Sequence, residues 1–72
     1  MKIEVISKFK EILDGRGIKQ SHFVKKYGMS ATTISALYRG GVPTLAYALI
    51  ISKELNLKVE DIWDVHNNRD TL

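Results

Sequence analysis

The apolar residues of this chain recur at helical spacing in short blocks, which glycine, proline and asparagine residues separate. The first block covers residues 5–14 and puts Ile6, Phe9 and Leu13 on one stripe. Spacings of three and four residues place these side chains on one face of a helix. The pair of glycines that follows favours a turn. We therefore expect a first helix here, preceded by residues that fray.

Two shorter helices are predicted at the centre of the chain, over residues 20–27 and 31–38. Gly28 follows the first of them, where a left-handed residue commonly ends a helix and glycine adopts that conformation without strain. Ser30 precedes the second, and its hydroxyl can accept a hydrogen bond from an amide two or three residues further on. A connection this short makes the helices cross steeply, so one face of the second stays free.

A fourth helix is expected from Thr44 to Leu55. Pro43 suits its first position, where no backbone donor is required, and Asn56 can end it in a left-handed conformation. Its expected inward stripe comprises Leu45, Ala48, Ile51, Ser52 and Leu55.

A short closing element follows, in which Trp63 is expected to cover the core. The residues from Val65 onward have no periodicity. We therefore divide the chain into a domain of residues 1–66, with the central helix pair at 20–39, and a mobile tail of residues 67–72.

The charge of the chain is unevenly distributed. Residues 1–42 hold eight basic and three acidic side chains, whereas residues 43–72 hold three basic and five acidic ones. No acid occurs between Lys19 and Lys53. Carboxylates would repel phosphates at contact distance, so an acid-free stretch around a free helix face suits a polyanionic partner.

The segment from Gln20 to Arg39 resembles the motif of the lambda-repressor/Cro-like helix-turn-helix family of transcriptional regulators. That family has a glutamine opening the first motif helix, a small residue four positions later, a glycine in the turn and aliphatic residues in the second helix. The matching positions are Gln20, Val24, Gly28, Ile34 and Leu37. Val24 departs from the pattern, since alanine is usual there. Similar features flank the motif, and the resemblance covers about residues 6–63.

The resemblance implies an all-α, compact five-helix domain that binds duplex DNA as a small phage- or plasmid-type repressor. Residues 31–38 would then form the recognition helix in the major groove. The outward positions of that helix, which match the base-reading positions of the family, are Ala31, Thr32, Ser35 and Ala36. The expected phosphate contacts are Lys19, Gln20, Thr33, Tyr38, Arg39, Gly40 and Gly41.

A symmetric homodimer on DNA is expected, because one small domain cannot grip a long site. The fourth helix and the closing element carry more apolar residues than one buried face requires. The expected dimer or partner interface comprises Tyr47, Leu49, Ile50, Val59 and Trp63. The alternative is a protein-interaction module, such as an antitoxin or anti-repressor, that keeps this fold and uses that interface to bind a partner protein.

Other functions find little support in the sequence. His22 and His66 are far apart with no ligand-spaced carboxylate or thiolate, so no metal site is expected, and His22 reads as a solvated residue. We find no catalytic constellation and expect no enzyme and no cofactor. With 72 residues we expect one domain and no small-molecule ligand. Without cysteine, a signal peptide or a membrane span, we expect a cytoplasmic protein.

Overall fold

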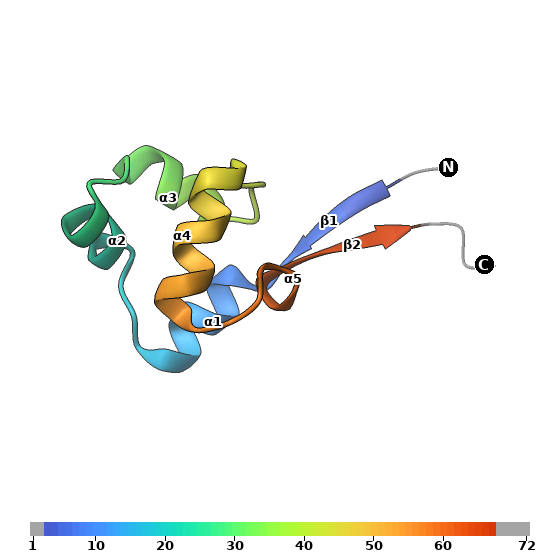
Figure 1. Ribbon diagram of the computed structural model, residues 1–72, viewed down its shortest axis with the longest axis horizontal. Helices are drawn as coiled ribbons and strands as arrows, with labels where there is room; N and C mark the ends of the chain where they lie inside the picture. The colour runs from blue at the N-terminus through green and yellow to red at the C-terminus, as the bar shows by residue number, and fades with distance from the viewer. Residues whose placement is uncertain (1–2, 68–72) are drawn as a thin grey trace.

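The computed structural model describes residues 3–67, which form five helices and a two-stranded antiparallel sheet (Figure 1). The helices pack into one body, and the paired strands project from it as a ribbon, at the right of Figure 1. The predicted all-α class is therefore wrong in one respect, since strands are present. The elements in order are β1 (Ile3–Ser7), α1 (Phe9–Arg16), α2 (Gln20–Tyr27), α3 (Ala31–Tyr38), α4 (Leu45–Leu55), α5 (Val59–Ile62) and β2 (Trp63–Asn67).

Aromatic residues from three separate elements meet at the centre of the core. The ring of Phe9 stacks on Trp63, with centroids 5.7 Å apart, and lies tilted against Phe23 at 5.8 Å. Trp63 is only 7% exposed, as expected of a residue that closes the core. The indole N–H of Trp63 is buried without an acceptor among the described residues. Trp63 therefore stabilises the domain through the apolar packing of its ring and not through a hydrogen bond. The largest fully buried side chains are Phe9, Phe23, Leu13, Ile34, Leu37, Ile51, Leu55 and Ile62.

The ribbon changes the predicted organisation of both ends of the domain. Residues 5–7 belong to β1 instead of the first helix. Residues 65–67, which have no periodicity in the sequence, belong to β2, so the strand includes the first residue of the expected tail. Val5 pairs with Val65 and Ser7 with Trp63, so each strand satisfies backbone groups of the other. The amide of Lys8 then donates to the carbonyl of Ile62 at 2.7 Å, which joins the ribbon to the helices. Residues 68–72 of the expected tail lie outside the described part of the chain.

The predicted helix ends are largely confirmed. Gly28 and Asn56 both adopt the left-handed conformation, with φ of 67° and 57°. The hydroxyl of Ser30 accepts a hydrogen bond from the amide of Thr33 at 3.3 Å and so caps α3.

The start of α4 differs from the prediction. Thr44 is the N-cap and accepts from the amide of Tyr47 at 3.3 Å, which leaves Pro43 outside the helix. Four of the five expected inward residues of α4 are buried, but Leu45 is 72% exposed. Leu45 shares their phase but lies in the first turn, beyond the edge of the core.

Candidate nucleic-acid interface

The turn between α2 and α3 is anchored to the core and to α4. Met29, a residue of this turn, is a core residue with only 5% of its surface exposed, so the turn is not a free loop. The amide of Ser30 donates to the hydroxyl of Tyr47 on α4 at 3.1 Å. These contacts, together with Gly28, hold α3 at a fixed angle to α2.

One face of α3 packs against the body and the other faces solvent. Ile34 is fully buried and Leu37 is 2% exposed, which puts the predicted packing face in the core. On the opposite face, Ala31, Thr32 and Ala36 are exposed and Ser35 is half-buried. The four predicted base-reading positions therefore lie on one surface made of small and hydroxyl-bearing side chains.

The amides after α3 bond within the chain, contrary to the expectation that they are free to donate to a phosphate. The amide of Gly40 donates to the carbonyl of Leu37 at 3.0 Å, and that of Gly41 donates to the carbonyl of Ala36 at 2.9 Å. These bonds satisfy carbonyls that the end of a helix otherwise leaves unpaired. The cation at this end, Arg39, is exposed.

The N-terminus of α2 offers backbone donors beside a cation. Lys19 is the N-cap residue, is exposed and supplies no side-chain hydrogen bond to the first turn. The first amides of a helix have no intrahelical acceptor, and the helix dipole favours an anion there. Gln20, the first residue of α2, is half-buried.

The other two predicted phosphate contacts are less exposed. Thr33 and Tyr38 are both half-buried. The hydroxyl of Tyr38 donates to Oδ1 of Asp14 at 2.7 Å, and this hydrogen bond raises the pKa of Tyr38 above its usual value of 10.0. Its proton is thus already shared with a carboxylate. The hydroxyl of Tyr38 therefore has no proton left to donate to a phosphate, which only accepts hydrogen bonds.

Residues 8–67 match the protein family described as the Cro/C1-type HTH DNA-binding domain. The chain belongs to this family. The match covers all five helices and the strand that ends the domain, so α2 and α3 are its helix-turn-helix motif. Comparisons with curated proteins and with solved structures give no significant match.

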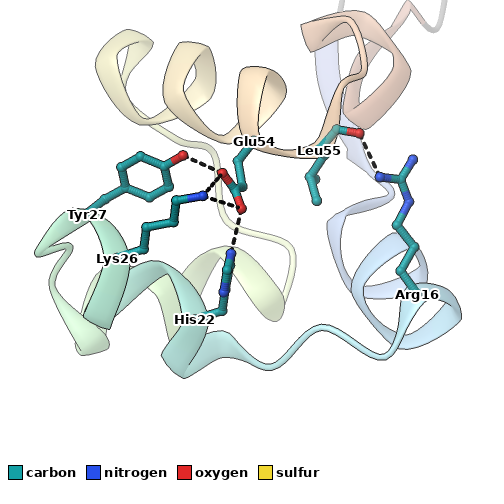
Figure 2. Close-up of polar contacts among 6 residues, drawn as sticks. All are labelled: Arg16, His22, Lys26, Tyr27, Glu54 and Leu55. Atoms are coloured by element: carbon teal, nitrogen blue, oxygen red, sulfur yellow. Dashed lines mark hydrogen bonds and ion pairs between the residues drawn. The ribbon is translucent and has the colours of Figure 1, made fainter.

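A carboxylate on α4 ties the helix-turn-helix motif to the rest of the domain. Figure 2 shows Glu54 facing three side chains of α2. Nε2 of His22 lies 2.6 Å from Oε2 of Glu54, Nζ of Lys26 donates to both carboxylate oxygens, and the hydroxyl of Tyr27 donates to Oε1. We call these four residues the Glu54 cluster. His22 is therefore paired, which corrects the expectation that it is simply solvated.

The three partners act together on the acidity of Glu54. Hydrogen bonds from Tyr27, His22 and Lys26 lower its pKa from 4.5 to about 2. The same carboxylate raises the pKa of Lys26 and of Tyr27 above their usual values, mainly through its hydrogen bonds. The carboxylate form of Glu54 is thus the one that this arrangement stabilises.

A second polar contact joins α1 to the end of α4. Nη1 of Arg16 donates to the carbonyl of Leu55 at 2.6 Å, as Figure 2 shows. The last carbonyls of a helix have no intrahelical donor, so the guanidinium satisfies one of them. Both α1 and α2 are thus fastened to the C-terminal half of α4.

Sequence reasoning missed the Glu54 cluster, although a signal for it exists. His22 and Lys26 are four residues apart and so share one face of α2. Glu54 is the first acid after the acid-free stretch from residue 19 to residue 53. Glu11 and Asp14 are nearer to α2 in the sequence, so the choice of Glu54 as the partner of α2 follows from the tertiary fold.

The predicted dimer or partner interface does not form an exposed patch. Trp63 is buried, and Tyr47, Ile50 and Val59 are half-buried and pack against the core. Only Leu49 of this set is well exposed, at 46%. Tyr47 and Ile50 therefore widen the core, whereas Leu45 and Leu49 leave part of the apolar surface of α4 exposed.

Residues 3–67 contain neither a candidate membrane span nor a cluster of metal ligands. No helix in this part of the chain is long and apolar enough to cross a membrane. Within the same residues, no three histidine, aspartate or glutamate side chains gather closely enough to hold a metal ion.

Proposed function

We propose that the protein is a sequence-specific transcriptional regulator of the small phage or plasmid type, which represses by placing α3 in the major groove of duplex DNA. The observation that carries this proposal is the exposed face of α3. It presents small and hydroxyl-bearing side chains, which fit closely against base edges. No acid lies in the sequence around it from residue 19 to residue 53.

The proposed roles follow from position and chemistry. Ala31, Thr32, Ser35 and Ala36 read bases, where each alanine can contact only a thymine methyl and each hydroxyl can donate or accept. Such side chains favour an operator with thymines at the methyl-contacting positions and some specificity from groove shape. The backbone is held by Lys19, Gln20, Thr33 and Arg39. Tyr38 is left out because its hydroxyl already donates to Asp14. Gly40 and Gly41 are left out of this set because their amides already bond within the chain.

We further propose a homodimer on DNA, with two motifs reading half-sites about 34 Å apart, one helical turn of DNA. The surface that supports it is an apolar cleft at the base of the ribbon. Val42, Leu45 and Val65 border this cleft and are each more than 60% exposed. A second copy would remove these side chains from water. A footprint over one half-site, with a monomer mass on DNA, would contradict the dimer.

Selection of binding sites from random duplex DNA, followed by a mobility shift with competitor DNA, tests the proposed function. A recovered consensus whose complex survives unrelated competitor would support a sequence-specific regulator. Recovery of no consensus, with complexes that any DNA displaces, would overturn it. That outcome would favour the alternative, a protein-interaction module that binds a partner protein through α4 and the closing element.

A further inference from the structure

A basic cleft lies where the end of α3 meets α1, beside the face proposed to read DNA. Two of its lining residues, Lys10 and Arg39, are exposed cations that lie 29 positions apart in the sequence. One comes from α1, outside the helix-turn-helix motif, and the other from the residue after α3. The cleft is lined by Ser7, Lys10, Glu11, Tyr38, Arg39 and Gly40.

The ammonium group of Lys10 is held in place by an aromatic ring. Its Nζ lies 5.7 Å from the centroid of the Tyr38 ring, within the range of a cation–π interaction. The hydroxyl of Tyr38 is in turn fixed by Asp14, which follows Lys10 by four residues and so lies on the same face of α1. The ring thus keeps a long, flexible side chain at the cleft that Arg39 borders.

We propose that Lys10 binds a backbone phosphate of the DNA next to the one held by Arg39, which makes α1 part of the interface. This inference rests on the proposed function. An ammonium and a guanidinium group both donate charge-assisted hydrogen bonds to phosphate oxygens. Tyr38 also lines a second cleft, together with Asp14, Ile18, Lys19 and Gln20. The phosphate site at Lys10 and the one at the start of α2 therefore flank the same ring.

Neighbouring carboxylates and the end of α3 oppose an anion here and set the design of the test. One of these carboxylates is that of Asp14, which accepts from the Tyr38 hydroxyl. The carboxylate of Glu11 lines the same cleft and repels a phosphate. The C-terminal end of α3 carries partial negative charge, so cations beside it also stabilise the helix in the absence of DNA. If Lys10 only stabilises the end of α3, replacing it should change the unfolding midpoint and leave the salt dependence of DNA binding unchanged.

The test measures DNA affinity against salt concentration for Lys10→Gln, Lys10→Arg and Lys53→Gln, using the operator recovered by selection. Lys53 is exposed in the last turn of α4 and lines neither cleft, so its variant removes the same charge elsewhere. Lys10→Gln should make the negative slope of log affinity against log salt shallower, by about 0.9 for each Lys10 removed or about 1.8 in a dimer. Lys10→Arg and Lys53→Gln should keep the slope of the unmodified protein.

The outcomes separate this inference from the proposed function. A reduced slope for Lys10→Gln alone, with the same preferred sequence and unfolding midpoint, supports the phosphate site. An unchanged slope for Lys10→Gln, or an equal reduction for Lys53→Gln, overturns it and leaves the regulator intact. Glu11→Gln gives an independent check, since removing the opposing carboxylate should tighten binding to all sequences alike. If the unmodified protein selects no DNA sequence, the proposed function itself fails.

Discussion

Nε2 of His22 lies 2.6 Å from Oε2 of Glu54, which joins the first helix of the motif to α4 across 32 positions of sequence. The carboxylate side chain of Glu54 is only 16% exposed, so this contact is shielded more than an ordinary surface pair. Lys19 and Gln20, at the start of α2, come two to three positions before His22, so their placement depends on how this contact orients α2. We therefore expect the Glu54 cluster to support DNA binding by positioning α2.

Replacing Glu54 with glutamine should lower the unfolding midpoint at pH 7 and reduce its dependence on acid. The folded pKa of Glu54 is lowered from 4.5 to about 2, so between these values the unfolded chain binds more protons than the folded one. The stability contributed by Glu54 is thus fully present above about pH 4.5 and is lost as the pH falls through 2. Urea unfolding at several pH values between 2 and 7 measures this.

A matched control for that series is Glu60→Gln, which removes an exposed carboxylate outside the cluster. Its unfolding curve should keep the acid dependence of the unmodified protein. Equal pH profiles for Glu54→Gln and the unmodified protein would mean that the cluster contributes nothing to the stability of the fold.

Replacing Gly41 with alanine should destabilise the domain by about 1–3 kcal/mol, the range for forcing an atom into a packed site. A Cβ atom there would lie 2.9 Å from the carbonyl oxygen of Ala36, a backbone atom that cannot swing away. Gly15→Ala is the control, because nothing lies within 4 Å of its Cβ position and alanine favours a helix. That variant should gain about 0.5–1 kcal/mol. Thermal unfolding of both variants gives the comparison.

The central motif could be predicted from the sequence because its determinants are local. Gly28 needs only its own left-handed conformation to end α2, and the cap of α3 joins Ser30 to a residue three positions away. The outward face of α3 follows from helical phase. Each of these features depends on residues only a few positions apart, so the local sequence is enough to predict it.

The ribbon and the Glu54 cluster could not be predicted in the same way, because they depend on residues far apart in the chain. Val5 and Ile6 fit a helical stripe with Phe9, and only pairing with residues 63–67 favours the strand instead. Leu45 fits the inward stripe of α4 but lies past the edge of the core. Whether a residue at a helix end is buried thus depends on which other elements pack there, and the helical periodicity of the sequence does not indicate this.

DNA binding should weaken steeply with salt. About two to four cationic contacts per protomer give a slope of log affinity against log salt of about −4 to −7 for a dimer, at about −0.9 for each phosphate neutralised. Lys19 and Arg39 supply two of these contacts in the proposed interface. Titrations of a labelled operator at four or more salt concentrations measure the slope. A slope near zero would be incompatible with binding through the DNA backbone.

Replacing Ala36 with arginine should change which sequence the protein prefers, whereas replacing Arg39 with alanine should weaken all sequences about equally. Ala36 is exposed on the outward face of α3, so a guanidinium group there can reach O6 and N7 of a guanine. The preference at one position should shift by about 1–3 kcal/mol towards guanine, with the domain still folded. Arg39 lies just after α3, where we expect it to contact a phosphate. Because phosphates are the same in every sequence, loss of this contact should not change base preference.

Selection from random DNA with both variants tests this division of roles. The Ala36→Arg consensus should gain a guanine, while the Arg39→Ala consensus should match that of the unmodified protein at lower affinity. Arg39→Ala should also reduce the magnitude of the salt slope by about 1 for each arginine removed, since one cation leaves the backbone. If Ala36→Arg instead recovers the original site and Arg39→Ala alters a base preference, the reading and positioning roles are reversed, and Arg39 reaches a base edge beyond the end of α3.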